Sequence, residues 1–133
     1  MRVFLGGTCN ESKWRNIMMV HLNEYGIDYF NPVVDDWTPE CQKIEIKERE
    51  NCDYCLYCIT PQMTGVYSIA EAVDDSNKKP EKTIFIALRD DCGKFTESQW
   101  KSISMVAYMI RKNGGLIFDN LKSAAIYLNE VKK

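Results

Sequence analysis

A regular alternation of short apolar runs and longer amphipathic or polar segments constrains the fold of this chain more than any other feature. The apolar runs predict strands at residues 2–5, 28–30, 53–59, 82–88 and 116–118. The segments between them predict helices over residues 12–25, 38–51, 68–77 and 96–112, and from residue 120 onward. Strands that are apolar at nearly every position are typical of a parallel sheet covered by helices on both faces.

Right-handed crossovers leave few topologies for such a chain, and the flavodoxin-like strand order 2-1-3-4-5 is the favoured one. We therefore predict an α/β fold, with one domain over residues 1–133 built on a doubly wound five-stranded parallel sheet. Capping residues mark the helix ends. Ser12 and Thr38 are the predicted N-caps of the first two helices, Pro39 suits a first helical position, and Gly26 closes the first helix.

The charge of the chain is nearly balanced, with 17 Lys and Arg against 19 Asp and Glu. No basic block follows any face, so nucleic acid is not an expected partner. No apolar run approaches the ~20 residues that cross a membrane, so no membrane association is expected. Met1–Leu5 leads directly into a strand without the long apolar region of a signal peptide. We expect a cytoplasmic protein.

The six cysteines predict neither a metal site nor a disulfide framework. Cys52, Cys55 and Cys58 have tandem C-x-x-C spacing, but they fall in a strand-like run whose side chains alternate between faces. Cys52 and Cys58 would then point one way and Cys55 the other, so the three thiols cannot converge on one ion. We expect inert buried thiols in a reducing compartment, no metal and no cofactor.

In the predicted topology, ligands bind where the first and third strands end, at the switch point of the sheet. The first strand is followed by residues 6–12, a small polar loop that includes Thr8, and the third by residues 61–67, a loop that includes Met63. Gly6, Gly7 and Gly65 allow the backbone to approach a ligand closely. The loops match neither G-x-G-x-x-G nor a P-loop, which leaves the kind of ligand open.

Glu71 has two interpretations. With Ser68 three positions before it, Glu71 completes a capping box, in which its side chain folds back onto the start of the helix. Alternatively, its carboxylate points into the crevice and acts as a nucleophile or a ribose ligand, in which case the helix dipole favours the ionised form. The two interpretations require opposite orientations of the side chain.

Two further groups flank the predicted crevice. Trp37 is placed to stack on a base and Asp36 to hydrogen-bond to it, although the same residues suit a loop with Trp37 as an apolar anchor. Arg15 and Lys13 are placed to meet a phosphate, or they form an ordinary exposed pair.

Several segments of the chain resemble the nucleoside 2-deoxyribosyltransferase family, in its smaller branch. The family pairs an aspartate at the head of the third strand, a following proline and a glutamate in the next helix, which correspond to Asp53, Pro61 and Glu71. Residues 4–8, Ser12, Trp14 and Arg15, and residues 31–37 and 80–83 also fit. The resemblance covers most of the chain and is strongest up to Leu88.

The resemblance implies that Glu71 attacks the anomeric carbon of a nucleoside or nucleotide and displaces the base. It implies a second acid at Glu45, with Glu48 one helical turn further on, and a role for Asp53 in catalysis. It also implies a homo-oligomer, a dimer or larger, in which a neighbour closes the site. The expected substrate contacts are Gly6, Gly7, Thr8, Arg15, Asp36, Trp37, Met63, Gly65 and Ser68.

The chain departs from this family at Gly65, where typical members carry an acidic residue six positions before the nucleophile. The departure keeps hydrolysis, and a protein that binds a nucleotide or a nucleotide-derived signal without turnover, as alternatives. Related TIR-like domains, which act on or sense NAD-type molecules, support the second alternative. A third alternative is an interaction module that uses the helix over residues 96–112, in which side chains would fill the crevice.

Overall fold

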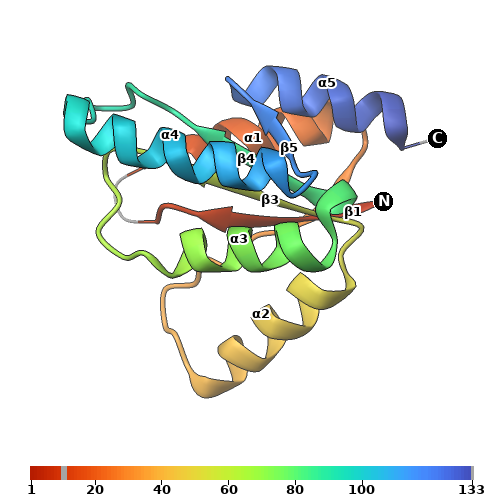
Figure 1. The fold of residues 1–133 in the computed structure, drawn as a ribbon. Helices are drawn as coiled ribbons and strands as arrows, with labels where there is room; N and C mark the ends of the chain where they lie inside the picture. Colours follow the sequence, from red (N-terminus) through yellow and green to blue (C-terminus); the bar gives the residue numbers. More distant parts are fainter. Residues whose placement is uncertain (10–11, 133) are drawn as a thin grey trace.

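The computed structural model describes residues 1–9 and 12–132. Its centre is one parallel sheet of five strands in the order β2-β1-β3-β4-β5, so the predicted fold class and strand order are confirmed (Figure 1). The strands are β1 (Arg2–Gly7), β2 (Asp28–Phe30), β3 (Tyr54–Ile59), β4 (Thr83–Ala87) and β5 (Leu116–Phe118). The switch point therefore lies between β1 and β3, as expected for this order.

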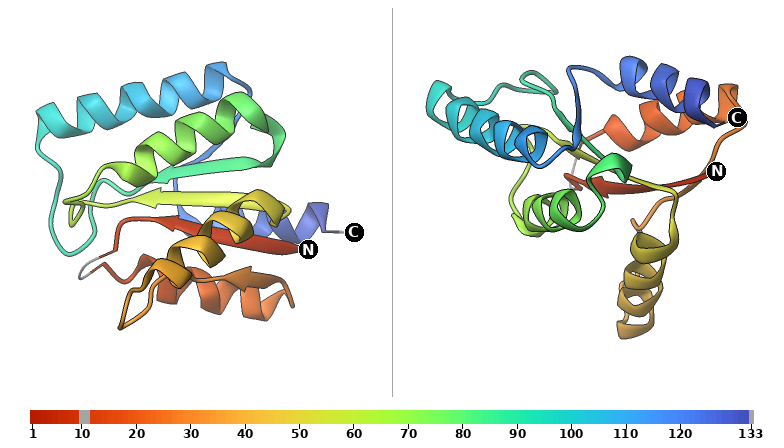
Figure 2. Two further views of the ribbon diagram at one scale, coloured as in Figure 1. Left: turned by 90° about the horizontal axis from the view of Figure 1, so that it is seen from below. Right: turned by 45° about the vertical axis from the view of Figure 1, so that its right-hand side comes forward.

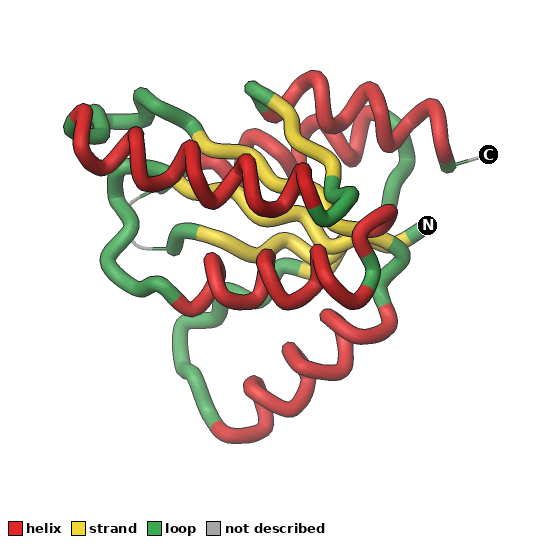
Figure 3. The backbone as a smooth tube through the Cα atoms, viewed as in Figure 1, coloured by secondary structure: helices red, strands yellow, loops and turns green. Residues whose placement is uncertain are grey.

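Within the described residues, four helices connect the strands and a fifth follows β5: α1 (Trp14–Glu24), α2 (Pro39–Asn51), α3 (Tyr67–Lys78), α4 (Glu97–Lys112) and α5 (Leu121–Val131). A short 3₁₀ turn, Pro80–Lys82, precedes β4. Helices α1 and α5 cover one face of the sheet, and α3 and α4 cover the other (Figures 1 and 3). Helix α2 projects away from the body, and none of its residues is buried (Figure 2).

The core has two layers because neighbouring strand residues point to opposite faces of the sheet. On β3, Leu56 and Cys58 face α1 and α5, whereas Cys55 and Tyr57 face α3 and α4. Helix α1 buries Trp14, Met18 and Leu22, at a spacing of four residues, against the first face.

The helix ends predicted at Thr38 and Gly26 are present. The Thr38 side chain accepts a hydrogen bond from the Cys41 amide at the start of α2, and Thr96 caps α4 in a capping box. The prediction for Ser12 is wrong, because α1 begins at Trp14 and the Ser12 hydroxyl instead donates to Asp91 Oδ2 at 2.9 Å. That contact fixes the loop after β1 to the loop after β4.

The cysteine predictions hold only in part. Cys55 and Cys58 are buried on opposite faces of β3, as predicted. Cys52 is also buried, but it ends α2 and packs on the same side as Cys55, so its predicted orientation is wrong. Cys9 and Cys92 are exposed, which contradicts the expectation that all the thiols are buried.

No helix within residues 1–9 and 12–132 is long and apolar enough to cross a membrane.

Candidate active site

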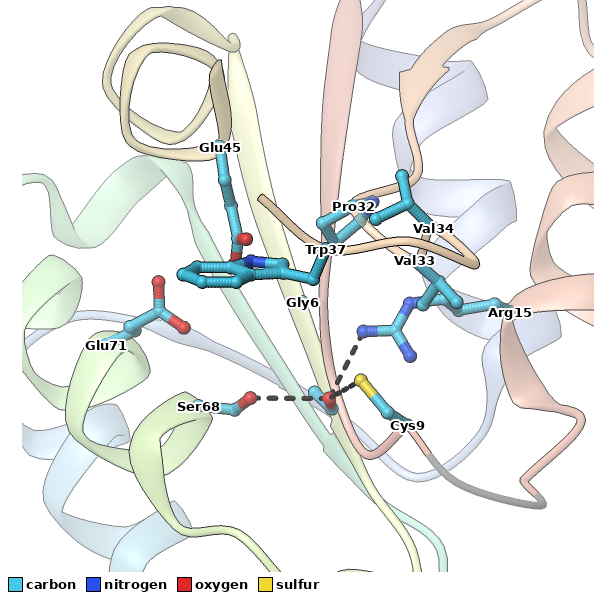
Figure 4. Close-up of a pocket in the computed structure, with 11 residues that line it drawn as sticks. Gly6, Cys9, Arg15, Pro32, Val33, Val34, Trp37, Glu45, Ser68 and Glu71 are labelled. Atoms are coloured by element: carbon cyan, nitrogen blue, oxygen red, sulfur yellow. Dashed lines mark hydrogen bonds between the residues drawn. The ribbon is translucent and has the colours of Figure 1, made fainter. Parts of the chain in front are cut away.

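A pocket of about 330 Å³ opens at the carboxyl end of β1 and beside the loop after β2, between α2 and the start of α3 (Figure 4). It is lined by Gly6, Gly7, Cys9, Arg15, Pro32, Val33, Val34, Trp37, Glu45, Ser68 and Glu71. The pocket lies at the predicted switch point. An open pocket there is inconsistent with an interaction module whose crevice is filled by side chains.

Glu71 lies in the pocket and does not cap its own helix. Helix α3 begins at Tyr67, its N-cap is Val66, and no side chain caps it. The capping-box interpretation is therefore wrong, and the hydroxyl of Ser68 instead donates to the carbonyl of Gly7 at 3.3 Å. The Glu71 side chain is 8% exposed, and its Oε2 lies 3.7 Å from Nε of Arg49.

A second carboxylate, that of Glu45, reaches the same pocket from α2. Figure 4 shows Glu45 and Glu71 approaching from two helices beside the indole ring of Trp37. Burial raises the pKa of Glu71 from 4.5 to about 7, the charge of Arg49 lowers it, and the charges of Glu45 and Asp75 raise it. Burial also raises the pKa of Glu45, against the charge of Arg15. The pocket thus pairs two carboxyl groups whose pKa values both lie above the ordinary value of a glutamate.

Arg15 is a buried cation in the wall of the pocket. Its Nε donates to the carbonyl of Leu5 at 3.1 Å, Nη2 donates to that of Gly7 at 3.1 Å, and Nη1 donates to that of Thr8. Burial lowers its pKa. The guanidinium therefore fixes the end of β1 and the start of the following loop. The predicted contact of Arg15 with a ligand would be a second role beside this structural one.

The two glycines at the end of β1 are required by packing inside the protein. A Cβ at Gly6 would lie 2.5 Å from the Tyr57 ring. Gly7 has φ +118°, and a Cβ there would overlap the backbone of Cys58 on the neighbouring strand. The sequence interpretation, in which these glycines serve the approach of a ligand, overlooked this constraint. Both still line the pocket.

A second hollow, of about 250 Å³, adjoins the first. It is lined by Gly7, Thr8, Cys9, Ile59, Met63, Thr64, Gly65, Tyr67 and Ser68. Gly7, Cys9 and Ser68 line both hollows. The predicted contacts Thr8, Met63 and Gly65 thus lie beside the first pocket, and the Thr8 hydroxyl oxygen also accepts a hydrogen bond from the amide of Thr60.

Three predicted residues lie elsewhere. Asp53 stands at the amino end of β3, where its Oδ2 accepts a hydrogen bond from the amide of Arg2 at 2.8 Å, at the opposite edge of the sheet. The structure therefore does not bring Asp53 into the pocket. Asp36 is exposed and does not line the pocket. Glu48 pairs with Arg2 at 2.8 Å.

Sequence reasoning missed two residues of the site. Arg49 is the cation beside Glu71, and Cys9 lines both hollows. Arg49 lies four positions after Glu45 on a predicted helix, so helical spacing alone could have placed the two on one face. Residues 10 and 11 of the predicted loop lie outside the described residues.

A comparison with protein families decides the membership of this chain. The model of the family described as "Nucleoside 2-deoxyribosyltransferase like" matches residues 1–90. The chain belongs to this nucleoside 2-deoxyribosyltransferase-like family. The match includes β1, α2, β3 and α3, and thus every residue that lines the pocket. No curated protein matches the chain significantly.

The raised pKa of Glu71 predicts that Glu71→Gln stabilises the fold at alkaline pH. Between the ordinary pKa of 4.5 and the folded-state value of about 7, the folded protein binds more protons than the unfolded chain. Stability is therefore lost as the pH rises through this window. The shift corresponds to about 3 kcal/mol. The gain in unfolding free energy from Glu71→Gln should be about 3 kcal/mol larger at about pH 8 than at about pH 4.

Urea denaturation of both proteins at the two pH values measures this difference. Asp74→Asn, which alters an exposed carboxylate on the same helix, serves as the control. An equal effect of Glu71→Gln at both pH values would contradict the burial of an ionisable Glu71.

Proposed function

We propose that this member of the nucleoside 2-deoxyribosyltransferase-like family cleaves or transfers the N-glycosidic bond of a nucleoside or nucleotide. One observation carries the proposal: the buried Glu71 carboxyl group, which caps no helix, shares an open pocket with a second carboxyl group, that of Glu45. Paired carboxyl groups of this kind serve glycosidic chemistry through an oxocarbenium-like transition state. The exposed ring of Trp37 offers a surface on which a base can stack.

In the proposed reaction, an Oε atom of Glu71 bonds to the anomeric carbon as the bond from that carbon to the base nitrogen breaks. The electron pair of the broken bond goes to the base, which takes a proton from Glu45. The resulting glycosyl ester of Glu71 then reacts with water or a second base, from which Glu45 removes a proton. The ester bond breaks, and both carboxyl groups return to their starting states.

Charges beside the two carboxyl groups bear on these roles, while burial raises the pKa of both groups. A nucleophile must be ionised, and the charge of Arg49 favours the ionised form of Glu71. A general acid must carry a proton, and burial raises the pKa of Glu45 toward that form. Because Glu71 has a pKa of about 7, the rate should fall as the pH drops below about 7.

Incubation of the purified protein with a panel of nucleosides, nucleotides and NAD tests the proposal. Chromatography should detect free base with at least one member of the panel. Addition of a second free base separates transfer, which yields a new nucleoside, from hydrolysis, which yields free sugar. Tight binding of a panel member without any release of base would reject the enzymatic proposal.

The second candidate, a protein that binds a nucleotide without turnover, is favoured by Gly65. A Cβ at Gly65 would meet no atom within 4 Å, so the second hollow has space where typical members of the family carry an acidic side chain. The absence of that carboxylate weakens the hold on a sugar while leaving the pocket open. The panel experiment separates this candidate from the first.

We also propose that the chain forms a homo-oligomer. Large apolar side chains are exposed in the pocket wall at Trp37, at the start of α3 at Val66 and Tyr67, and on α4 at Met105, Tyr108 and Met109. Exposed apolar groups of this size are typical of surfaces that another chain covers.

A further inference from the structure

Helix α2, which carries Glu45, is attached to the body by charged side chains. None of its residues is buried, and Figure 2 shows it projecting from the remainder of the fold. Two consecutive residues near its end make the attachments. Glu48 pairs with Arg2 of β1, and Arg49 pairs with carboxylates of α3. The position of Glu45, one helical turn before Arg49, therefore depends on these ion pairs.

Arg49 is fixed by a partly buried hydrogen-bond network. Its Nη2 donates to Oδ1 of Asp75 at 2.8 Å and to Oδ2 of Asp74 at 3.0 Å. Its Nε donates to the hydroxyl of Tyr57 at 3.1 Å. That hydroxyl in turn donates to Oδ2 of Asp75 at 2.5 Å. These contacts join α2, α3 and β3 and define the direction of the guanidinium plane.

The same guanidinium lies against Glu71. Its Nε is 3.7 Å from Oε2 of Glu71, and its Nη2 donates to the backbone carbonyl of Glu71 at 3.3 Å. Arg49 lies in the walls of two further hollows, one of about 190 Å³ and one of about 250 Å³, both distinct from the two described above. Trp37, Glu45 and Glu71 line the smaller of these as well as the candidate active site. Arg49 thus crosses a partly open gap between α2 and α3.

We propose that Arg49 is a positioning residue of the site, whose guanidinium holds α2, and with it Glu45, opposite Glu71 and places a positive charge beside the Glu71 carboxyl group. The inference rests on the proposed function where it treats Glu71 as the nucleophile. Asp75 has the complementary role, because it fixes Arg49 and opposes the effect of Arg49 on Glu71. The proposal assigns Arg49 no contact with the substrate.

Charged and titratable groups surround Glu71 from three elements. Arg49 and Glu45 approach from α2, Asp75 from α3 and Tyr57 from β3. On the pocket side, Arg15 and Cys9 complete the lining. Burial raises the pKa of Glu71 most, and Arg49 is the group that lowers it, while Glu45 and Asp75 raise it. Removal of Arg49 and removal of Asp75 should therefore shift the titration of Glu71 in opposite directions.

Titration of the Glu71 carboxyl carbon by ¹³C NMR tests the inference without any substrate. Arg49→Met should lower the ionised fraction of Glu71 at about pH 6 by about tenfold, the effect of a rise of one unit in pKa. Asp75→Asn should raise that fraction, because it removes a negative charge and releases the charge of Arg49. The control Asp74→Asn, which alters an exposed partner of Arg49, should leave it nearly unchanged.

Asp75→Asn keeps the shape of the side chain, so it carries the test alone if Arg49→Met does not fold. Where base release is measured, the acidic limb of the kcat/KM profile should move with the NMR titration in each variant. An unchanged titration in Asp75→Asn, or shifts of the same sign in both variants, would overturn the role of Arg49. If Glu71→Gln retains full activity while the NMR shifts occur, the proposed function fails and the electrostatic role of Arg49 stands.

Discussion

Replacement of Glu71 by glutamine is expected to lower the rate of base release at least about 10³-fold, because it removes the attacking carboxylate and nearly nothing else. Glutamine has the same length and fills the same space, and the lost ion pair with Arg49 is a contact of 3.7 Å. The variant should therefore fold and bind its ligand. Single-turnover measurements on the active substrate from the panel give the rate of the chemical step.

Two further measurements distinguish loss of the nucleophile from general damage. Mass spectrometry of the protein quenched during turnover should detect a glycosyl adduct on the wild type and none on Glu71→Gln. Glu40→Gln, which changes an exposed carboxylate on α2 that pairs with Lys43 of the same helix, should keep most of the activity. Turnover by Glu71→Gln at the wild-type rate would disprove the assignment of the nucleophile.

The fold could be predicted because the local patterns in this chain agree with its tertiary structure. The predicted strand at residues 28–30 and the helix ends at Thr38 and Asn51 match the structure. The two failed caps, Ser12 and Ser68, share one cause. Their hydroxyl groups bond to distant partners, to Asp91 and to the carbonyl of Gly7. Such contacts cannot be read from the sequence around a helix start.

The candidate site could be predicted only in part. Glu71 follows from its place relative to the switch point and from the family resemblance, Glu45 follows from the resemblance alone, and both line the pocket. Asp53 follows from the resemblance alone, and the structure places it at the opposite edge of the sheet. Arg49 was missed because its side-chain partners on α3, Asp74 and Asp75, lie 25 and 26 residues away in the chain.

Gly7→Ala is expected to destabilise the fold by about 3 kcal/mol or more, although it adds one methyl group at the wall of a pocket. Gly7 has φ +118°, which disfavours any residue with a Cβ. The added Cβ would also lie 2.7 Å from the amide nitrogen of Cys58 and closer still to its carbonyl oxygen. These are backbone atoms of the paired strand β3, so relief of the overlap requires β1 and β3 to separate.

Gly65→Ala is the matched control, because an added Cβ there meets no atom within 4 Å. Its unfolding free energy should stay within about 0.5 kcal/mol of the wild type in urea denaturation. The carbonyl of Gly7 accepts hydrogen bonds from Arg15 and Ser68, so a shift of this strand end also moves two walls of the pocket. Gly7→Ala should therefore lose ligand affinity as well as stability, whereas equal stability of the two variants would contradict the close pairing of β1 with β3 at the pocket floor.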